Sequence, residues 1–600
     1  MSLSRRAFLG TTSALALAYG LPKDSLGSAL AAPAKPNVDA PTTLLQTVTQ
    51  KQTPVRGKYR TLLAGPGEPH LARYDVLGFK PRGNRYQRRR SIGYLGHMSD
   101  IHIMDAQSPA RIEPLTQPFP STFAGAIRPQ DTLTVFVQGQ ILATMQAARY
   151  SPLTGAPMAA LLNTGDNADM HSDLELQWYI DILDGQSVTP NSGEAGVYDG
   201  PQAWLDIEYA WHPADPGDNP FGEYGFPQIP DLLNTAVSTA MDSPGSPVPW
   251  YTVFGNHDTL YFGAFPIDAA LRALALGGKK PAEANALAGD YLNGMAQNPT
   301  ALTRLEAWIR TQFGAQSGMM SVPSDPARRL MDSTYFIQAH LNSPDMPGPV
   351  GHGFTQENLD TGRTYWKADA GPRIRLFGLD TCNQVMGADG AVPRDQFDWL
   401  ESELAQVVKE DKLALILSHH NSYTLENAAE PVMGESQDLV HAEEFVDMLL
   451  KYPNMIAWVN GHTHINTITA HPPKEKKQGG FWEITTASCI DYPQTQQTIE
   501  IVDNQDQTIS IFATVIDALA PATWDGKDLS PTGLASLSRE LASNDWIENP
   551  LMRIGSAYDR NVELLLPAPF KMSKISPAEL ERTDASRKAR LIAGRKASRS

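Results

Sequence analysis

The chain has 600 residues, of which 42% are hydrophobic, and its formal net charge is −17. This length exceeds that of a small domain and predicts one large elaborated domain or two to three domains. The acidic balance argues against a nucleic-acid-binding surface, so we expect no nucleic-acid partner. Two cysteines, Cys382 and Cys489, exclude a disulfide scaffold and a zinc–cysteine site, and they are either two buried thiols or one bridge.

The N-terminus resembles an export signal. Residues 4–10 read Ser-Arg-Arg-Ala-Phe-Leu-Gly, an apolar stretch continues to Leu21, and Ala29-Leu30-Ala31 is a small-x-small cleavage site. We therefore expect a twin-arginine signal peptide over residues 1–31 and a protein of the periplasm, cell envelope or exterior; the alternative is a chance Arg-Arg pair. No later apolar stretch reaches about 18 residues, so no membrane span is expected in the mature chain.

An N-terminal arm is expected over residues 32–90, loosely held as far as about residue 60 because it is rich in Pro and Thr. Four arginines near its end, Arg85 and Arg88 to Arg90, are either a phosphate-attracting rim or a solvated basic loop. A strand over 92–98 follows and ends in Asp100 and His102. Because side chains at i and i+2 of an extended chain share a side, both can bind one ion.

The next strand, over 158–162, comes after an insertion (about 105–157) that contains a predicted helix from Asp131 to Arg149. It leads into Gly165 and Asp166, where the glycine permits a sharp turn and the carboxylate points into a crevice. A helix over 172–183 follows. Residues 185–248 form a long irregular insertion whose aromatic residues either line a substrate cleft or pack within the loop itself.

A strand over 248–254 runs into Gly255, Asn256, His257 and Asp258, the most specific run in the chain. The Asn256 carbonyl is a hard neutral ligand for a divalent cation. His257 can donate a proton, and Asp258 is expected to orient its ring. Residues 262–370 are a further insertion, with helical apolar spacing over 267–276 and 302–309, that we interpret as a cap.

Strands and helices then alternate. We predict strands over 374–379, 413–417 and 455–459, with helices over 394–408 and 441–451 between them. The second strand ends in His419 and His420, and the third in His462 and His464. Further strands over 481–486, 497–502 and 508–515 complete a domain spanning 91–520, and residues 521–600 form a C-terminal extension with a basic, partly disordered tail.

Five strand-like runs therefore end in Asp, Asn or His. Because such ends gather at one crevice of an α/β sheet, we expect these residues to project from the same edge of one sheet. A single histidine is more often structural, but five independent strand ends are hard to explain as core filling. Hard oxygen and imidazole donors without thiolate suit Mn, Fe, Zn or Co.

The order of these motifs resembles the calcineurin-like metallophosphoesterase superfamily, and within it an exported bacterial branch with large insertions. The matching blocks are Asp100-Ile101-His102, Gly165 to Asp169, Gly255 to Asp258, His419 and Gly461 to His464. The resemblance spans about 92–515 and implies a four-layer α/β/β/α sandwich. Asp169 stands where purple acid phosphatases have a tyrosine ligand, which argues against that subclass.

Carried over residue by residue, the resemblance implies a dinuclear centre. One metal ion would be held by Asp100, His102, Asp166 and His464, and the other by Asp166, Asn256, His419 and His462. His420 is a rival for the role of His419. The implied reaction is hydrolysis of a phosphate mono- or diester by a metal-bridging hydroxide, with His257 as the acid and Asp258 as its orienting partner.

The alternative is a non-catalytic metal-bearing binding protein of the cell envelope, whose insertions would form a partner surface. A nuclease is disfavoured because the chain is acidic and has no basic stripe. The phosphate ester, the metal pair and the oligomeric state do not follow from the sequence.

Overall fold

The computed structural model describes residues 36–576, apart from 82, 118–122, 268, 284–317, 345, 432–435 and 476–478. The predicted signal peptide, the helix predicted over 302–309 and the tail beyond residue 576 lie outside the described residues. In the part of the chain that the structure describes, no helix combines the length and the apolar character that crossing a membrane requires.

A seven-stranded mixed sheet forms one half of the core. Its order is β3-β21-β20-β19-β4-β5-β8, in which β4, β5 and β8 run parallel and β19 is antiparallel to both β4 and β20. The strands are β3 (Leu71–Arg73), β4 (Arg90–Met98), β5 (Met158–Asn163), β8 (Trp250–Thr252), β19 (Thr495–Asp503), β20 (Thr508–Asp517) and β21 (Val562–Pro567).

A six-stranded sheet forms the other half, in the order β11-β12-β14-β16-β18-β17. Its four central strands are parallel, and an antiparallel strand closes each edge. The strands are β11 (Trp366–Asp369), β12 (Ile374–Gly378), β14 (Leu413–Leu417), β16 (Met455–Asn460), β17 (Thr467–His471) and β18 (Phe481–Thr485).

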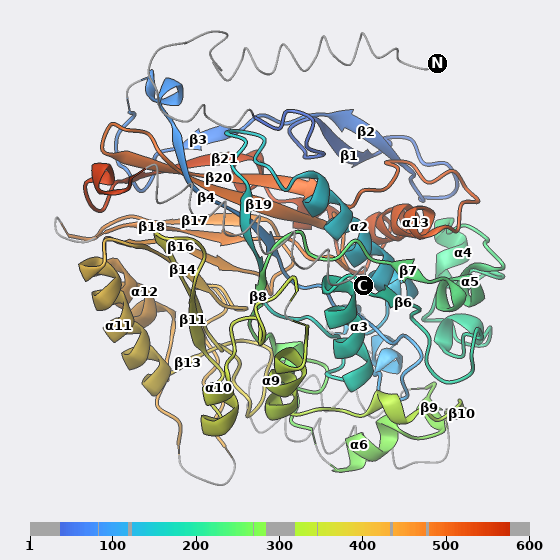
Figure 1. Cartoon of the computed structure of the whole chain (residues 1–600). Helices are drawn as coiled ribbons and strands as arrows, with labels where there is room; N and C mark the ends of the chain where they lie inside the picture. The colour runs from blue at the N-terminus through green and yellow to red at the C-terminus, as the bar shows by residue number, and fades with distance from the viewer. Residues whose placement is uncertain are drawn as a thin grey trace, which may run out of the picture.

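The two sheets lie face to face (Figure 1). Along β14, Leu413, Leu415 and Leu417 belong to the core shared with the seven-stranded sheet, whereas Ala414 and Ile416 belong to a second core beneath the helices. This alternation is the period-2 pattern of a strand buried on both faces. The sheets approach closely at Gly93, where a Cβ atom would lie 2.3 Å from Ile374 Cδ1.

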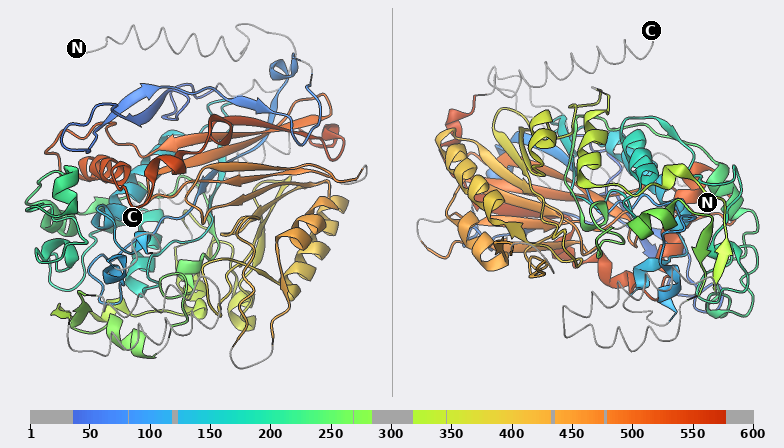
Figure 2. Two further views of the ribbon diagram at one scale, coloured as in Figure 1. Left: turned by 180° about the vertical axis from the view of Figure 1, so that it is seen from behind. Right: turned by 90° about the horizontal axis from the view of Figure 1, so that it is seen from below.

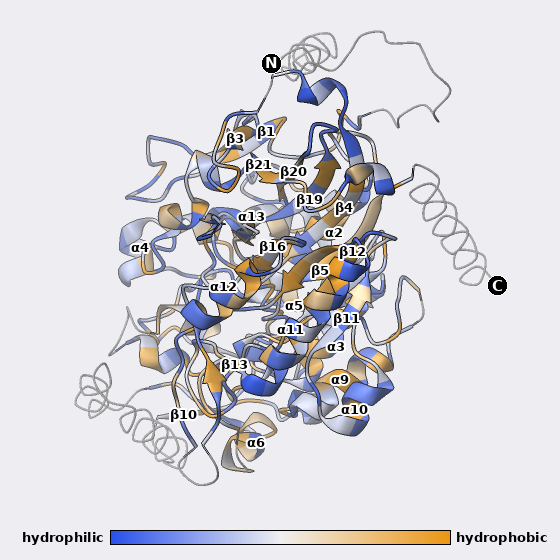
Figure 3. Cartoon of the chain, turned by 90° about the vertical axis from the view of Figure 1, so that its left-hand side faces the viewer, coloured by the Kyte–Doolittle hydropathy of each residue, from blue (hydrophilic) through white to orange (hydrophobic). Residues whose placement is uncertain are grey.

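Helices cover the outer face of each sheet, as Figure 2 shows from two further directions. The six-stranded sheet is covered by α11 (Arg394–Lys409) and α12 (Ala442–Leu450), whose buried residues recur at helical spacing. The seven-stranded sheet is covered by α2 (Thr134–Ala147), α3 (Asp173–Leu183) and α13 (Pro531–Ser543). Hydrophobic residues gather on β5 and β20, and hydrophilic residues on the outside of α11 (Figure 3). The predicted four-layer α/β/β/α architecture is confirmed.

Two of the predicted insertions contain short elements. Residues 185–248 contain β6 (Ser187–Val188), α4 (Pro220–Tyr224), α5 (Leu232–Ser238) and β7 (Met241–Asp242). Residues 262–370 contain α6 (Ala269–Ala275), β9 (Lys279–Pro281), β10 (Met319–Ser321), α9 (Ser333–Leu341) and α10 (Gln356–Thr361). Between β12 and α12, β13 (Val392–Pro393) pairs with β15 (Leu439–Val440).

Aromatic residues of the insertion over 185–248 pack on one another and on Trp546. Phe221 and Phe226 have ring centroids 5.3 Å apart, and the ring of Tyr224 stacks on that of Trp546 at 4.6 Å. Trp211 lies 5.7 Å from Phe226 and is buried. These contacts favour local packing over a substrate cleft.

The N-terminal segment differs from the loosely held arm that the composition predicts. Strands β1 (Gln46–Gln50) and β2 (Leu62–Pro66) form a hairpin. Between them Tyr59 is 2% exposed and donates a hydrogen bond to Glu540 of α13. Residues beyond 520 likewise contribute β21 to the sheet, so both ends of the described chain belong to the folded domain.

Two further expectations of the sequence are resolved here. Arg85 and Arg89 both pair with the buried Glu563 of β21, so these two arginines are neither a solvated loop nor a phosphate-attracting rim. Cys382 and Cys489 are both free and buried.

Candidate metal centre

The proposed ligands gather where strands of both sheets end. Three of the five motifs follow β4, β5 and β8 of the seven-stranded sheet, and two follow β14 and β16 of the six-stranded sheet. The expectation of one sheet edge is therefore wrong: the motifs meet at the shared end of two facing sheets. The structure brings together Asp100, His102, Asp166, Asn256, His419, His462 and His464.

The backbone at these strand ends is strained. Five of the seven residues have positive φ, namely Asp100 (50°), His102 (49°), Asp166 (51°), His462 (68°) and His464 (57°). Residues other than glycine rarely adopt this conformation, which costs on the order of 1 kcal/mol each and tends to occur at functional sites. Backbone hydrogen bonds hold it, since Asp100 N donates to Gly165 O at 3.0 Å and His102 N to Asp166 O at 2.9 Å.

A first quartet of ligand atoms surrounds one point. Asp100 Oδ1 lies 3.2 Å from His464 Nε2, which lies 3.2 Å from His102 Nε2. His102 Nε2 in turn lies 3.5 Å from Asp166 Oδ2. Ligand atoms about 2.0–2.2 Å from one ion lie about 3–4 Å from one another, so this spacing fits a shared cation.

A second quartet begins at the same carboxylate oxygen. Asp166 Oδ2 lies 3.1 Å from His419 Nε2, and that nitrogen lies 3.2 Å from His462 Nδ1. His462 Nδ1 is a further 3.2 Å from Asn256 Oδ1. Asp166 Oδ2 is thus common to both quartets, as a ligand bridging two ions would be.

The chemistry of the donors also fits metal ions. Five of the seven side chains have an exposed fraction of 2% or less, among them the carboxylates of Asp100 and Asp166, which lie within 4.0 Å of the same His419 Nε2. Two buried carboxylates and four imidazoles around one cluster require compensating positive charge, which divalent cations supply. The donors are carboxylate, amide oxygen and imidazole, the set that Mn, Fe, Zn and Co accept.

The same carboxylates shift the pKa values of the histidines around them. Burial lowers the pKa of His419, but Asp166 and Asp100 more than offset it and raise the pKa to about 9. Likewise Asp100 and Asp491 raise the pKa of His464 to about 9 against the effect of burial. Burial raises the pKa of Asp100, but His464 and His419 bring this pKa down to about 2.

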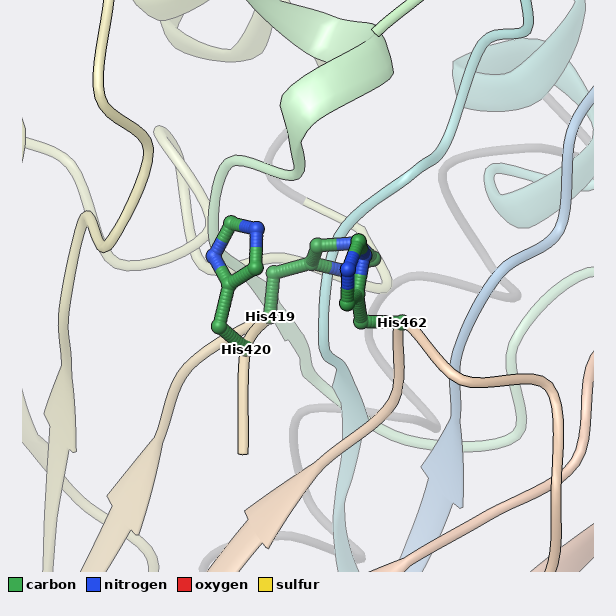
Figure 4. A group of neighbouring side chains, drawn as sticks. All are labelled: His419, His420 and His462. Carbon is green, nitrogen blue, oxygen red and sulfur yellow. The ribbon is translucent and has the colours of Figure 1, made fainter. Parts of the chain in front are cut away.

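His420 is the rival for the role of His419, and the two rings come from one turn beside His462 (Figure 4). Both ring nitrogens of His420 already have partners, Thr381 Oγ1 and Ala388 O, each at 2.8 Å. In His419, Nδ1 donates to Thr164 O at 2.9 Å, whereas the neighbours of Nε2 are two other proposed ligands, Asp166 Oδ2 at 3.1 Å and His462 Nδ1 at 3.2 Å. These contacts favour His419 as the ligand.

His257 lies beside the first quartet, with its ring 4.7 Å from that of His102. Its Nδ1 donates to the carbonyl oxygen of Asp169 at 2.6 Å and lies 3.9 Å from the Asp169 carboxylate. A carbonyl can only accept a hydrogen bond, so Nδ1 carries a proton and Nε2 is the nitrogen that remains for the chemistry. The side chain is 16% exposed.

Asp258 does not make the contact that the sequence predicts. Its carboxylate accepts hydrogen bonds from the backbone of Gly255, Asn167 and Ala168 at 2.9–3.1 Å. Asp258 ends η6 (Asn256–Asp258), in the turn after β8. Its carboxylate accepts from backbone N–H groups of the turn after β5, so it connects the two turns. The residue that holds His257 is Asp169.

Three residues that hold the proposed ligands in place, Asp169, Arg111 and Asp491, have no role that the sequence predicts. The Asp169 carboxylate accepts from His102 Nδ1 at 3.0 Å and is held by the buried Arg111. Asp491 accepts from His464 Nδ1 at 2.6 Å. Asp169 lies inside a recognised motif, but Arg111 and Asp491 lie in stretches with no local signal, and only the fold brings them to the site.

The α/β/β/α sandwich and the two quartets define a protein with a candidate dinuclear metal centre between its sheets. No family model matches the sequence, and no curated protein matches it. Among solved structures, the chain is similar to a dimetal phosphatase from Danio rerio, with 10% identity, a TM-score of 0.31 and coverage of 72% of this chain and 100% of that one. It is also similar to a purple acid phosphatase from seeds of yellow lupin (Lupinus luteus), with 9% identity, a TM-score of 0.25 and coverage of 78% and 55%.

Proposed function

We propose that the chain is a metal-dependent phosphoesterase of the calcineurin-like metallophosphoesterase superfamily that hydrolyses phosphate mono- or diesters. The observation that carries the proposal is the position of Asp166 Oδ2, which belongs to both ligand quartets, 3.5 Å from His102 Nε2 and 3.1 Å from His419 Nε2. A carboxylate shared in this way suits two ions held side by side, the arrangement used for in-line phosphoryl transfer to water.

Two divalent ions in these quartets would neutralise charge on the phosphoryl group and activate a water nucleophile. The chain itself supplies the proton for the leaving group. Nδ1 of His257 keeps its proton on Asp169 O, so the acid is the doubly protonated ring, which gives its Nε2 proton to the departing oxygen and is left neutral. The His257 backbone N–H donates to Asp166 Oδ1 at 2.9 Å, which ties the acid to the shared carboxylate.

The proposal is tested with the mature protein supplied with Mn²⁺ and, separately, Zn²⁺. p-Nitrophenyl phosphate and bis-p-nitrophenyl phosphate report monoesterase and diesterase activity, and a panel of nucleotides, sugar phosphates and phospholipid head groups defines the natural class. Asp166→Asn is the control, since it removes charge from both quartets and should abolish turnover. A metal-replete wild-type chain that cleaves none of these esters would favour the non-catalytic binding protein.

We also propose that the protein leaves the cytoplasm by the twin-arginine route, on the basis of Arg5 and Arg6 and the apolar stretch behind them. This route exports folded proteins, which suits a chain that must load its metal first. Fractionation of cells expressing the full chain and an Arg5→Lys/Arg6→Lys variant tests it. Equal export of both would contradict the assignment.

A further inference from the structure

We propose that Asp491 is a positioning residue for the metal centre, which fixes His464 in the tautomer that binds the ion. The inference rests on the metal centre of the proposed function. Asp491 lies in the loop between β18 and β19, and 27 residues separate it from His464. Its side chain is 2% exposed, and Oδ2 lies 2.6 Å from His464 Nδ1.

The contact decides which nitrogen of His464 is free. With an ion in the first quartet, Nδ1 would carry the proton that the Asp491 carboxylate accepts, and Nε2 would keep its lone pair for the ion. Nε2 is the atom of the first quartet, 3.2 Å from Asp100 Oδ1 and 3.2 Å from His102 Nε2. A carboxylate behind a ligating imidazole orients the ring and raises its basicity, which strengthens metal binding.

Two arginines, the buried Arg128 and the half-buried Arg553, hold Asp491 in its charged form and in place. Arg128 Nε donates to Asp491 Oδ1 at 2.7 Å and Nη2 to Oδ2 at 3.4 Å, so the pair is bidentate. Arg553 Nη1 lies 3.5 Å from Oδ2. Pairing of this geometry fixes the carboxylate more firmly than a single contact does, because both oxygens are constrained.

The loop that carries Asp491 is also fixed through its backbone. Asp491 N donates to Ser488 Oγ at 3.0 Å, and the carbonyl of Ile490 accepts from Gln130 at 3.1 Å and from Gln494 at 3.0 Å. Gln130 and Arg128 belong to one segment, which therefore hydrogen-bonds to the loop at two positions. The segment before α2 and the β18–β19 loop together set the position of a metal ligand that belongs to neither.

The test is a metal titration of the purified full chain in its metal-free form, by competition with a chromogenic chelator and with Zn²⁺ and Mn²⁺ as probes. We expect Asp491→Asn to weaken one of the two binding steps by about 10–100-fold, the usual effect of losing such a partner. Only one step should change, because His464 belongs to the first quartet alone. Binding of both ions with wild-type affinity by Asp491→Asn would overturn the inference.

The matched control is Glu563→Gln. Glu563 is also a buried carboxylate paired with two arginines, Arg85 and Arg89, but it contacts none of the seven proposed ligands. The Glu563→Gln variant should have a lower thermal unfolding midpoint in its metal-free form, and its affinities for both metal ions should be unchanged. An equal loss of affinity in the control would assign the effect of Asp491→Asn to general destabilisation and contradict a positioning role.

If Asp491→Asn does not fold, Asp491→Glu replaces it, since it keeps the charge for Arg128 and displaces the carboxylate by one methylene. The same weakening is expected, and unchanged affinity again overturns the inference. The titration requires no substrate, so a wild-type chain that binds two ions and cleaves no ester refutes the proposed function alone. A wild-type chain that binds no ion refutes both.

Discussion

His257 is the residue that the proposed chemistry requires to donate a proton to the leaving group. Its ring is oriented by the bond from Nδ1 to the carbonyl of Asp169, which leaves Nε2 as the nitrogen without that partner. We expect His257→Ala to keep its metal ions and to lose most turnover on esters with poor leaving groups, because an alkoxide needs a proton to depart. Proton transfer by a placed side chain contributes about 10²–10⁴-fold.

The measurement compares kcat on an alkyl phosphate and on p-nitrophenyl phosphate, whose leaving group departs without a proton. The loss should be much larger for the alkyl ester. Wild-type turnover of that ester by a metal-replete His257→Ala variant would show that His257 is not the acid.

At this scale the sequence predicts the residues that lie in short motifs and misassigns some of their contacts. His462 and His464 are recognisable because a strand and a turn place them locally. Asp258 follows His257 directly, yet its carboxylate meets the amides of Asn167 and Ala168, contributed by another strand end. Such contacts depend on how two turns meet, which no local spacing encodes.

The turn after β8 shows how little space the strand ends leave. A Cβ atom on Gly255 would lie 2.1 Å from Asp166 Oδ1 and 2.2 Å from Asp166 N. Gly255→Ala must therefore displace the shared carboxylate or the turn itself. Overpacking of this kind costs about 1–3 kcal/mol, and we expect loss of metal affinity as well.

Urea unfolding and metal titration of Gly255→Ala measure both effects. Gly83→Ala is the control, because a Cβ atom there has no heavy atom within 4 Å. We expect the control to match the wild type in both measurements. Wild-type stability and affinity in Gly255→Ala would mean that the two turns are not as close as the structure places them.

Helix α9 carries a titratable group into the core. Burial lowers the pKa of His340 to about 4, against the opposing effect of its hydrogen bond to Phe336 O. An unfolded histidine has a pKa of about 6.5, so the unfolded state binds the proton first. Neutral His340 makes its full contribution to the free energy of unfolding above pH 6.5. This contribution is lost as the pH falls toward 4, at on the order of 1 kcal/mol per pH unit.

Replacement by a residue that does not titrate removes this dependence. We expect His340→Gln to lower the free energy of unfolding at neutral pH and to flatten its decline between pH 6.5 and about 4. Denaturant titrations of metal-free wild type and variant at several pH values give the two slopes. Parallel slopes would show that the buried neutral state of His340 does not contribute.

Elements with a strong local pattern are predicted well, and elements defined by distant partners are not. The helix predicted over 394–408 is α11 at Arg394–Lys409, and the strand over 413–417 is β14. The strand predicted over 248–254 has only three residues in β8, because residues beyond it turn toward the site. Strand β21 was missed because Glu563 interrupts its apolar run, and its burial depends on two arginines far away in the chain.

At the scale of the whole molecule, the division of the strands into two sheets is the feature that residue patterns do not contain. Buried parallel strands have the same apolar sequence pattern in either sheet. The strand ends alone therefore predict that the ligands project from one edge of a single sheet. The interface between the sheets is specified by contacts such as Trp482 Nε1 to Leu565 O at 3.2 Å, which join residues 83 positions apart. Only the resemblance to a known superfamily implied the second sheet.

This division makes the metal centre a link between the two halves of the core. Asp100, His102, Asp166 and Asn256 follow strands of one sheet, whereas His419, His462 and His464 follow strands of the other. Ions held by both sets bind the folded chain and not the unfolded one. Mass action then stabilises the fold by about 1.4 kcal/mol for each tenfold rise of free metal above the dissociation constant.

We therefore expect a chelator to lower the urea midpoint of the wild type, and added Zn²⁺ or Mn²⁺ to raise it in proportion to the logarithm of its free concentration. A His462→Ala/His464→Ala variant removes two ligands of the six-stranded sheet and should show little of this dependence, because the remaining donors lie mostly on one sheet. If the urea midpoint of the wild type does not change with the free metal concentration, no ion joins the two sheets. A variant that responds as strongly as the wild type would place the stabilising ion elsewhere.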